Sequence, residues 1–180
     1  MFLTDQETEK VLNTINGMNH KITALLMCIV MLFSLSGCQM VKSINDGPKK
    51  GEKEYAQQVF EYLKNEDIDS LVELFAPSVR AKHSLESEWK SFFDHMDGKI
   101  VSYKGLKYPG EGLEKDKDGK VCDSHISVNY VGAKTDKGTV YEEFGYYHVK
   151  VSRDGPDSVG MTVFTMKDPD TGSWITVGGE

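Results

Sequence analysis

The fold is decided by residues 124–131, SHISVNYV, in which polar and apolar side chains alternate from His125 to Tyr130. Successive side chains of an extended strand point to opposite faces, so the apolar members share one face and the polar members the other. The apolar members are Ile126, Val128 and Tyr130, and the polar members are His125, Ser127 and Asn129. This alternation predicts a strand with one face on a core and the other turned to solvent or a partner.

The same two-residue period recurs before and after this stretch. It predicts further strands over residues 100–107, 140–152, 159–166 and 173–177. Glycine, proline and aspartate gather in the intervening turns, at residues 117–119, 136–138, 154–156 and 168–172. Strands that follow one another across short turns predict an antiparallel sheet.

Before Gly98 the apolar residues recur every three or four positions, which predicts three helices. The first covers residues 52–64, and the second begins after an N-cap at Asp67 and ends near Pro77. The third begins after Ser84 and ends before Gly98. Helices followed by strands predict an α+β fold, with three N-terminal helices packed on an antiparallel sheet.

An uncharged stretch of fourteen residues, ITALLMCIVMLFSL, occupies positions 22–35. A bilayer-spanning helix needs about 20 apolar residues, whereas the apolar core of a signal peptide has about 7–15. Lys21 supplies a positive charge just before the stretch. We therefore expect an export signal. A transmembrane helix and a secreted protein without lipid stay open as alternatives.

The run Leu35-Ser36-Gly37-Cys38 resembles a lipobox, the recognition site of the bacterial lipoprotein signal peptidase. The resemblance implies cleavage before Cys38 and a diacylglyceryl group on its sulfur. Each buried CH₂ of an acyl chain contributes about 0.8 kcal/mol, and two chains anchor a protein stably. The implied address is the extracytoplasmic face of a bacterial cell membrane, with the protein tethered through Cys38.

Three parts of the chain are expected. Residues 1–37 form the signal peptide region, residues 38–52 the lipidated cysteine and a flexible tether, and residues 53–180 a single α+β domain. Residues 1–17 are acidic where a signal peptide should be positive, so we expect translation to start at Met18. Cys122 alone would remain in the mature domain, so no disulfide is expected within it.

Charge and spacing exclude several classes of partner. The net charge of −7 argues against a nucleic-acid partner, which needs a basic patch or stripe. No two histidines, nor a histidine and an aspartate, stand at metal-ligand spacing on one helix face, so no metal is expected. Nothing in the sequence indicates a cofactor.

Two further stretches resemble the nuclear-transport-factor-2-like cone fold, which is related to the cystatin-like architecture. They are NEDIDSLVELFAP at residues 65–77, similar to its second helix, and GSWITV at residues 172–177, similar to its last strand. The resemblance covers residues 52–180 and implies that the helices lie on the concave face of a curved sheet, with a pocket between them. The succession of lipobox, tether and cone is similar to lipoproteins of Firmicutes that carry a domain of unknown function, family 5104. That similarity implies a fold and an address but no activity.

Aromatic residues and one histidine are the candidates for a pocket lining. They are Tyr55, His83, Trp89, Tyr103, Tyr130 and Tyr147. Tyrosine and tryptophan combine an apolar body with a polar tip, which suits such a lining. The alternative is that the aromatic residues form the core of the sheet and that His83 is a solvated loop residue. His125 and His148 are expected at the surface, and no catalytic residue is identified.

These features predict a membrane-anchored binding module for a small apolar ligand or a protein. The alternative is a small cofactor-free enzyme of the isomerase or dehydratase type, an activity found in some proteins with the cone fold. Such an enzyme needs a buried histidine or aspartate that faces a deep cavity. A third hypothesis is a homodimer formed through the open face of the sheet.

Overall fold

The structure is a computed structural model, and it describes residue 49 and residues 51–179. The expected signal peptide, the motif that ends at Cys38 and most of the expected tether lie outside the described residues. Among the residues that are described, no helix is both long enough and apolar enough to cross a membrane.

Helices come first along the chain and strands follow, as the sequence predicts for an α+β fold. The helices are α2 (Glu52–Asn65), α3 (Ile68–Glu73), α4 (Pro77–Arg80) and α5 (Leu85–Asp94). The strands are β1 (Ile100–Ser102), β2 (Gly105–Lys115), β3 (Val121–Val131), β4 (Ala133–Thr135), β5 (Val140–Tyr141), β6 (Phe144–Val151), β7 (Gly160–Lys167) and β8 (Trp174–Gly178). A short 3₁₀ helix, η2 (Pro156–Ser158), connects β6 to β7.

The helix ends follow local chemistry. The Asp67 side chain caps α3 by accepting a hydrogen bond of 3.2 Å from the backbone N–H of Ser70, as predicted. Pro77 does not end this helix. It is the first residue of α4, a place that suits proline because no helical N–H is needed there. Ser84 precedes α5, but its side chain makes no capping hydrogen bond.

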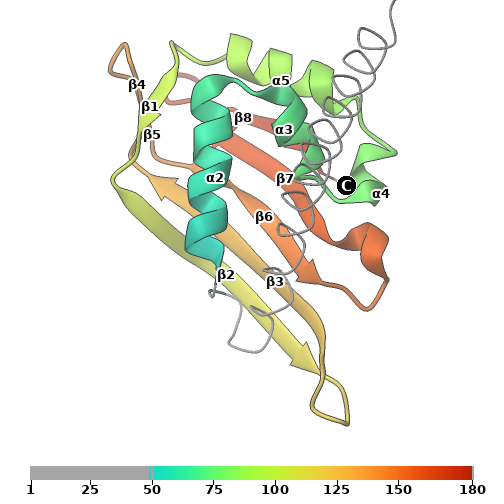
Figure 1. The fold of residues 1–180 in the computed structure, drawn as a ribbon. Helices are drawn as coiled ribbons and strands as arrows, with labels where there is room; N and C mark the ends of the chain where they lie inside the picture. The colour runs from blue at the N-terminus through green and yellow to red at the C-terminus, as the bar shows by residue number, and fades with distance from the viewer. Residues whose placement is uncertain (1–48, 50, 180) are drawn as a thin grey trace, which may run out of the picture. The chain divides into compact units, whose positions relative to one another are not determined.

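The strands form two antiparallel sheets (Figure 1). One has five strands in the order β2-β3-β6-β7-β8, and the other has three in the order β1-β4-β5. Two predicted strands, residues 100–107 and 140–152, are each divided between the sheets. The chain passes from one sheet to the other at residues 103–104 and 142–143, and at Gly132, whose φ is +62°.

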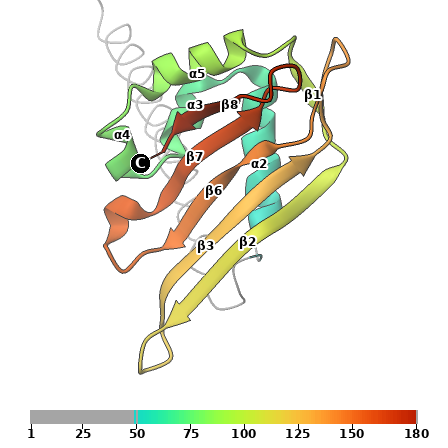
Figure 2. The same cartoon turned by 180° about the vertical axis from the view of Figure 1, so that it is seen from behind.

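The helices cover one face of the five-stranded sheet, and Figure 2 shows the other face with no described helix in front of it. We call these the covered face and the open face. The predicted alternation in residues 124–131 is confirmed, because its apolar members are buried on the covered face. Cross-strand partners of those residues extend the covered face into β6 and β7, through Tyr146, His148 and Phe164.

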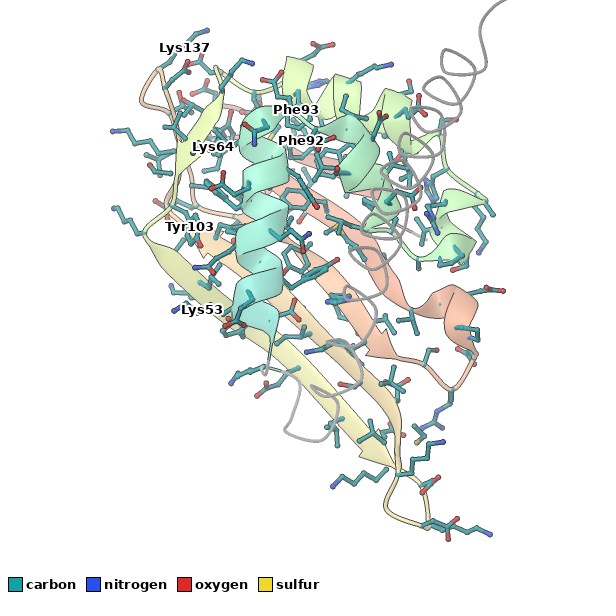
Figure 3. All side chains as sticks on the ribbon, viewed as in Figure 1. Lys53, Lys64, Phe92, Phe93, Tyr103 and Lys137 are labelled. Carbon is teal, nitrogen blue, oxygen red and sulfur yellow. The ribbon has the colours of Figure 1, made fainter. Side chains whose placement is uncertain are left out.

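Aromatic side chains fill the space between α5 and the covered face. The ring of Phe164 lies 5.2 Å from Trp89, 5.5 Å from Phe92 and 5.1 Å from Phe144, measured between centroids. Figure 3 labels Phe92 and Phe93 on α5 at this end of the domain. The part of the covered face that lies against α5 is therefore a closely packed aromatic core.

Candidate functional site

The covered face changes character where α2 begins, because buried polar groups replace the aromatic core. We call this group the Glu52 cluster, and it consists of Glu52, Tyr55, Tyr146, His148 and Lys150. The first two residues stand three apart on α2 and therefore share one side of that helix. The other three alternate along β6, which places all of them on the covered face.

Glu52 is the centre of the cluster and is only 1% exposed. The hydroxyl of Tyr146 donates a 2.9 Å hydrogen bond to its Oε1. His148 Nδ1 lies 3.3 Å from Oε1 and 3.4 Å from Oε2, and the ammonium of Lys150 lies 3.5 Å from Oε2. A buried carboxylate is tolerated only when it is paired and hydrogen-bonded, and these three groups meet that requirement.

The protonation states follow from these contacts. Burial acts to raise the pKa of Glu52, but hydrogen bonds from His148 and Tyr146 and the positive charge of Lys150 outweigh it. The pKa of Glu52 therefore lies below its ordinary value. Burial raises the pKa of Tyr146 and of Tyr55 far above the ordinary phenol value. At neutral pH, Glu52 is thus a carboxylate and both tyrosines keep their protons.

His148 has one engaged and one unengaged ring nitrogen. Its ring stacks on Tyr55 with centroids 4.4 Å apart and planes 16° apart. Because Nδ1 faces the carboxylate of Glu52, we assign its proton to Nδ1, which leaves a lone pair on Nε2. Nε2 is buried and forms no hydrogen bond with any residue that the structure describes. Leaving such an atom unpaired costs about 1–3 kcal/mol and calls for an explanation, as it does for Trp89 Nε1 and Thr135 Oγ1, which are also buried and unpaired among the described residues.

The expectation that His148 lies at the surface is wrong, because the residue is only 3% exposed. It pairs with Ile126 across the strands and therefore shares the buried face. Aromatic residues occupy both faces of β6, so its pattern does not reveal which side is covered. His125 does lie on the open face, where its ring stacks on Tyr147 at 5.3 Å and contacts Asp123.

The six residues predicted to line a pocket are distributed over the domain. Tyr55 joins the Glu52 cluster, whereas Trp89 and Tyr130 are buried in the core. Tyr103 packs on Phe60 with ring centroids 4.6 Å apart, and Figure 3 shows it beside α2. The remaining two lie elsewhere: Tyr147 is on the open face, and His83 contacts the segment after β8.

Three members of the Glu52 cluster are absent from the predicted pocket lining: Glu52, Tyr146 and Lys150. Glu52 falls both at the end of the expected tether, residues 38–52, and at the start of the expected helix, residues 52–64, and no role is predicted for it. It lies three positions before Tyr55, on the same side of α2 as the apolar stripe, and this spacing could have placed it in the domain. Lys150 gave no signal, because a lysine near a strand end is normally solvated.

The open face carries a shallow groove of about 310 Å³. Its lining includes Ser127, Asn129, Gly145, Tyr147, Val163, Thr165 and Trp174. Trp174 is 54% exposed, which is unusual for so large an apolar side chain. A second hollow of the same volume lies between α2 and α3. Both are at the lower limit for small-molecule pockets, and neither includes His148.

Within residues 49 and 51–179, no three histidine, cysteine, aspartate or glutamate side chains are placed so as to hold one ion together.

The fold and site define a class: an α+β domain with helices on one face of an antiparallel sheet and a buried carboxylate–histidine pair between α2 and β6. The chain belongs to the family described as domain of unknown function (DUF5104), whose model matches residues 58–168, more than half of the chain. The matched segment contains Tyr146 and His148 but begins after Glu52. A comparison with curated proteins gave no match.

Proposed function

We propose that the chain is a lipid-anchored lipoprotein of the Firmicutes type, held on the extracytoplasmic face of the cell membrane through Cys38. Its domain, in this proposal, is a nuclear-transport-factor-2-like cone that binds a small ligand at the Glu52 cluster. Because neither hollow includes His148, the ligand would enter by displacing side chains that cover the cluster. The observation that supports binding most strongly is the buried, unengaged Nε2 of His148. The lipobox and the tether support the address.

The chemistry of the cluster indicates the kind of ligand. The charge of Glu52 is already paired with Lys150 and hydrogen-bonded by His148 and Tyr146, so a charged ligand group would meet no unpaired countercharge from Glu52. Nε2 accepts a hydrogen bond, and the side chains beside it in the sheet, Ile126 and Met161, are apolar. The proposed ligand is therefore a largely apolar molecule with one hydrogen-bond donor, such as a hydroxyl group.

Extraction of the protein from its own host tests the binding proposal. The full chain is purified in mild detergent and denatured, and the released small molecules are identified by mass spectrometry. We expect a compound at near-equimolar amount from wild type and at least a tenfold loss from His148→Phe. His125→Phe, a change on the open face, is the matched control and should retain the compound. Equal recovery from all three proteins would contradict the proposal.

The address is tested separately with labelled fatty acid in growing cells. Label should appear on wild type and on Cys122→Ala, and should be lost from Cys38→Ala. Wild-type protein that carries no label and keeps an intact N-terminus would refute lipidation without affecting the ligand site.

An enzyme of the isomerase or dehydratase type is the second candidate, and the contact between Glu52 and His148 favours it. A carboxylate that orients an imidazole through Nδ1 leaves Nε2 to act as a general base. The extracted compound, incubated with wild type in heavy water, distinguishes the two functions. Deuterium incorporation by wild type but not by His148→Gln supports an isomerase that abstracts a carbon-bound proton. If the compound binds but gains no deuterium, the result supports a binding module and argues against that isomerase.

A further inference from the structure

A second histidine, far from the Glu52 cluster, joins three segments of the chain. Glu88 in α5 accepts a 2.7 Å hydrogen bond from the backbone N–H of Gly178 through Oε2. Its other oxygen, Oε1, lies 3.1 Å from Nδ1 of His83, which is in the loop between α4 and α5. His83 Nε2 lies 3.0 Å from the carbonyl oxygen of Gly179, just after β8.

The number of protons decides how many of these contacts are hydrogen bonds. A carboxylate oxygen and a carbonyl oxygen only accept, and a neutral imidazole carries a single N–H. Neutral His83 therefore donates to Glu88 or to Gly179, but not to both. The imidazolium form has two N–H groups and donates to both. We propose that His83 is a pH-sensitive clamp that holds the end of β8 against α5 when its ring is protonated.

The surroundings allow this titration. Glu88 is the charged side chain that contacts His83 within the described part of the chain, and Arg80 of the adjacent α4 is paired with Glu73 instead. The side chains of His83 and Glu88 are 23% and 29% exposed, so protons can exchange with solvent. Histidine is the side chain that ordinarily changes charge between about pH 5 and pH 8, so the clamp is tested over that range.

The segment that His83 and Glu88 hold is the end of β8. β8 is an edge strand that pairs only with β7 in the described sheet, and α5 packs against it. Gly178 has a φ of +71°, and a Cβ there would lie 2.6 Å from the ring of Phe75. The backbone after β8 is thus held in a turn that favours glycine, and the clamp fixes that turn to α5. Loss of one hydrogen bond should loosen the turn first.

This inference does not depend on the proposed ligand, and amide hydrogen exchange tests it. The full chain in detergent micelles is followed by NMR from pH 5 to pH 8, with rates corrected for intrinsic exchange. We expect the protection of the Gly178 amide to fall about tenfold as His83 loses its proton. In His83→Gln the protection should not depend on pH, whereas His125→Gln should keep the wild-type fall.

A measurement on wild type alone covers the case in which His83→Gln does not fold. The ring nitrogens of each histidine are followed by ¹⁵N NMR over the same pH range. The proposal predicts that the exchange protection of the Gly178 amide changes over the same pH range as the ¹⁵N signals of His83. Protection that is constant with pH, or that follows His125 or His148 instead, would overturn the proposal.

Discussion

Tyr146 and Tyr147 are neighbours in β6 and have opposite environments. Tyr146 is 4% exposed on the covered face and donates its hydroxyl to Glu52. Tyr147 is half-buried on the open face, where it stacks on His125 and borders the groove. Residue type is the same in both cases, so the role of each tyrosine is set by the face of the sheet on which it lies.

This comparison separates two kinds of surface within one sheet. On the covered face, helices exclude water, so a deleted side chain leaves a cavity and a deleted charge leaves unpaired partners. On the open face, water replaces whatever is removed. A substitution on the covered face should therefore lower the free energy of unfolding more than a comparable substitution on the open face.

The largest effect is expected for the aromatic core. Phe164→Ala should lower the free energy of unfolding by about 4 kcal/mol, because a buried phenylalanine leaves a cavity. Val163→Ala, one position away on the open face, should cost less than about 1 kcal/mol. Urea denaturation measures both values. Similar costs for the two variants would contradict the assignment of the faces.

The next effect concerns the buried carboxylate. Glu52→Gln should cost about 3 kcal/mol at pH 7, because it removes the charge that pairs with Lys150 and that accepts hydrogen bonds from His148 and Tyr146. Glu54→Gln, an exposed change in the same helical turn, is the matched control and should be nearly neutral.

The lowered pKa of Glu52 also predicts how the free energy of unfolding depends on pH. The pKa of Glu52 is lower in the folded protein than its ordinary value of 4.5. Its stabilising contribution is therefore complete well above pH 4.5 and is lost as the pH falls through the lowered folded pKa. Wild type should lose stability over this acid range more steeply than Glu52→Gln. Parallel curves would show that the carboxylate is not held as described.

A smaller effect is expected at Gly145, which lines the groove on the open face. A Cβ on Gly145 would overlap the carbonyl oxygen of Val128 and lie 2.9 Å from Cα of Asn129. Gly145→Ala should therefore cost about 2 kcal/mol by forcing β3 and β6 apart. At Gly105, by contrast, an added Cβ meets nothing within 4 Å, so Gly105→Ala is the control and should cost much less. Thermal unfolding of both variants measures the difference.

The smallest effect on stability is expected at the rim of the groove. Trp174→Ala should change the free energy of unfolding by less than about 0.5 kcal/mol, because the side chain is largely exposed. If the open face mediates a homodimer, the same change should weaken self-association in sedimentation experiments. Val101→Ala, exposed on the smaller sheet, is the control. A monomer that is insensitive to both changes would argue against the dimer.

The sequence predicted that helices precede antiparallel strands, because hydrophobic period and turn chemistry are local properties. It predicted three helices and one sheet, whereas the described residues form four α-helices, with α4 as the addition, and two sheets. It did not predict that three extended segments pass between two sheets, since the two-residue period continues through each bend. It also missed Glu52, whose pairing with Tyr146 and His148 joins positions 94 and 96 residues apart. A contact of that kind depends on how α2 packs on β6, which periodicity alone does not specify.

The central claim is that the Glu52 cluster is a ligand site on the covered face, and a crystal structure of the lipidated protein from its own host tests it most directly. The account predicts electron density for a non-protein molecule that donates a hydrogen bond to Nε2 of His148, with Nδ1 facing Glu52. A structure in which His148 is exposed, or in which Nε2 is bonded to another residue of the chain, would contradict the account.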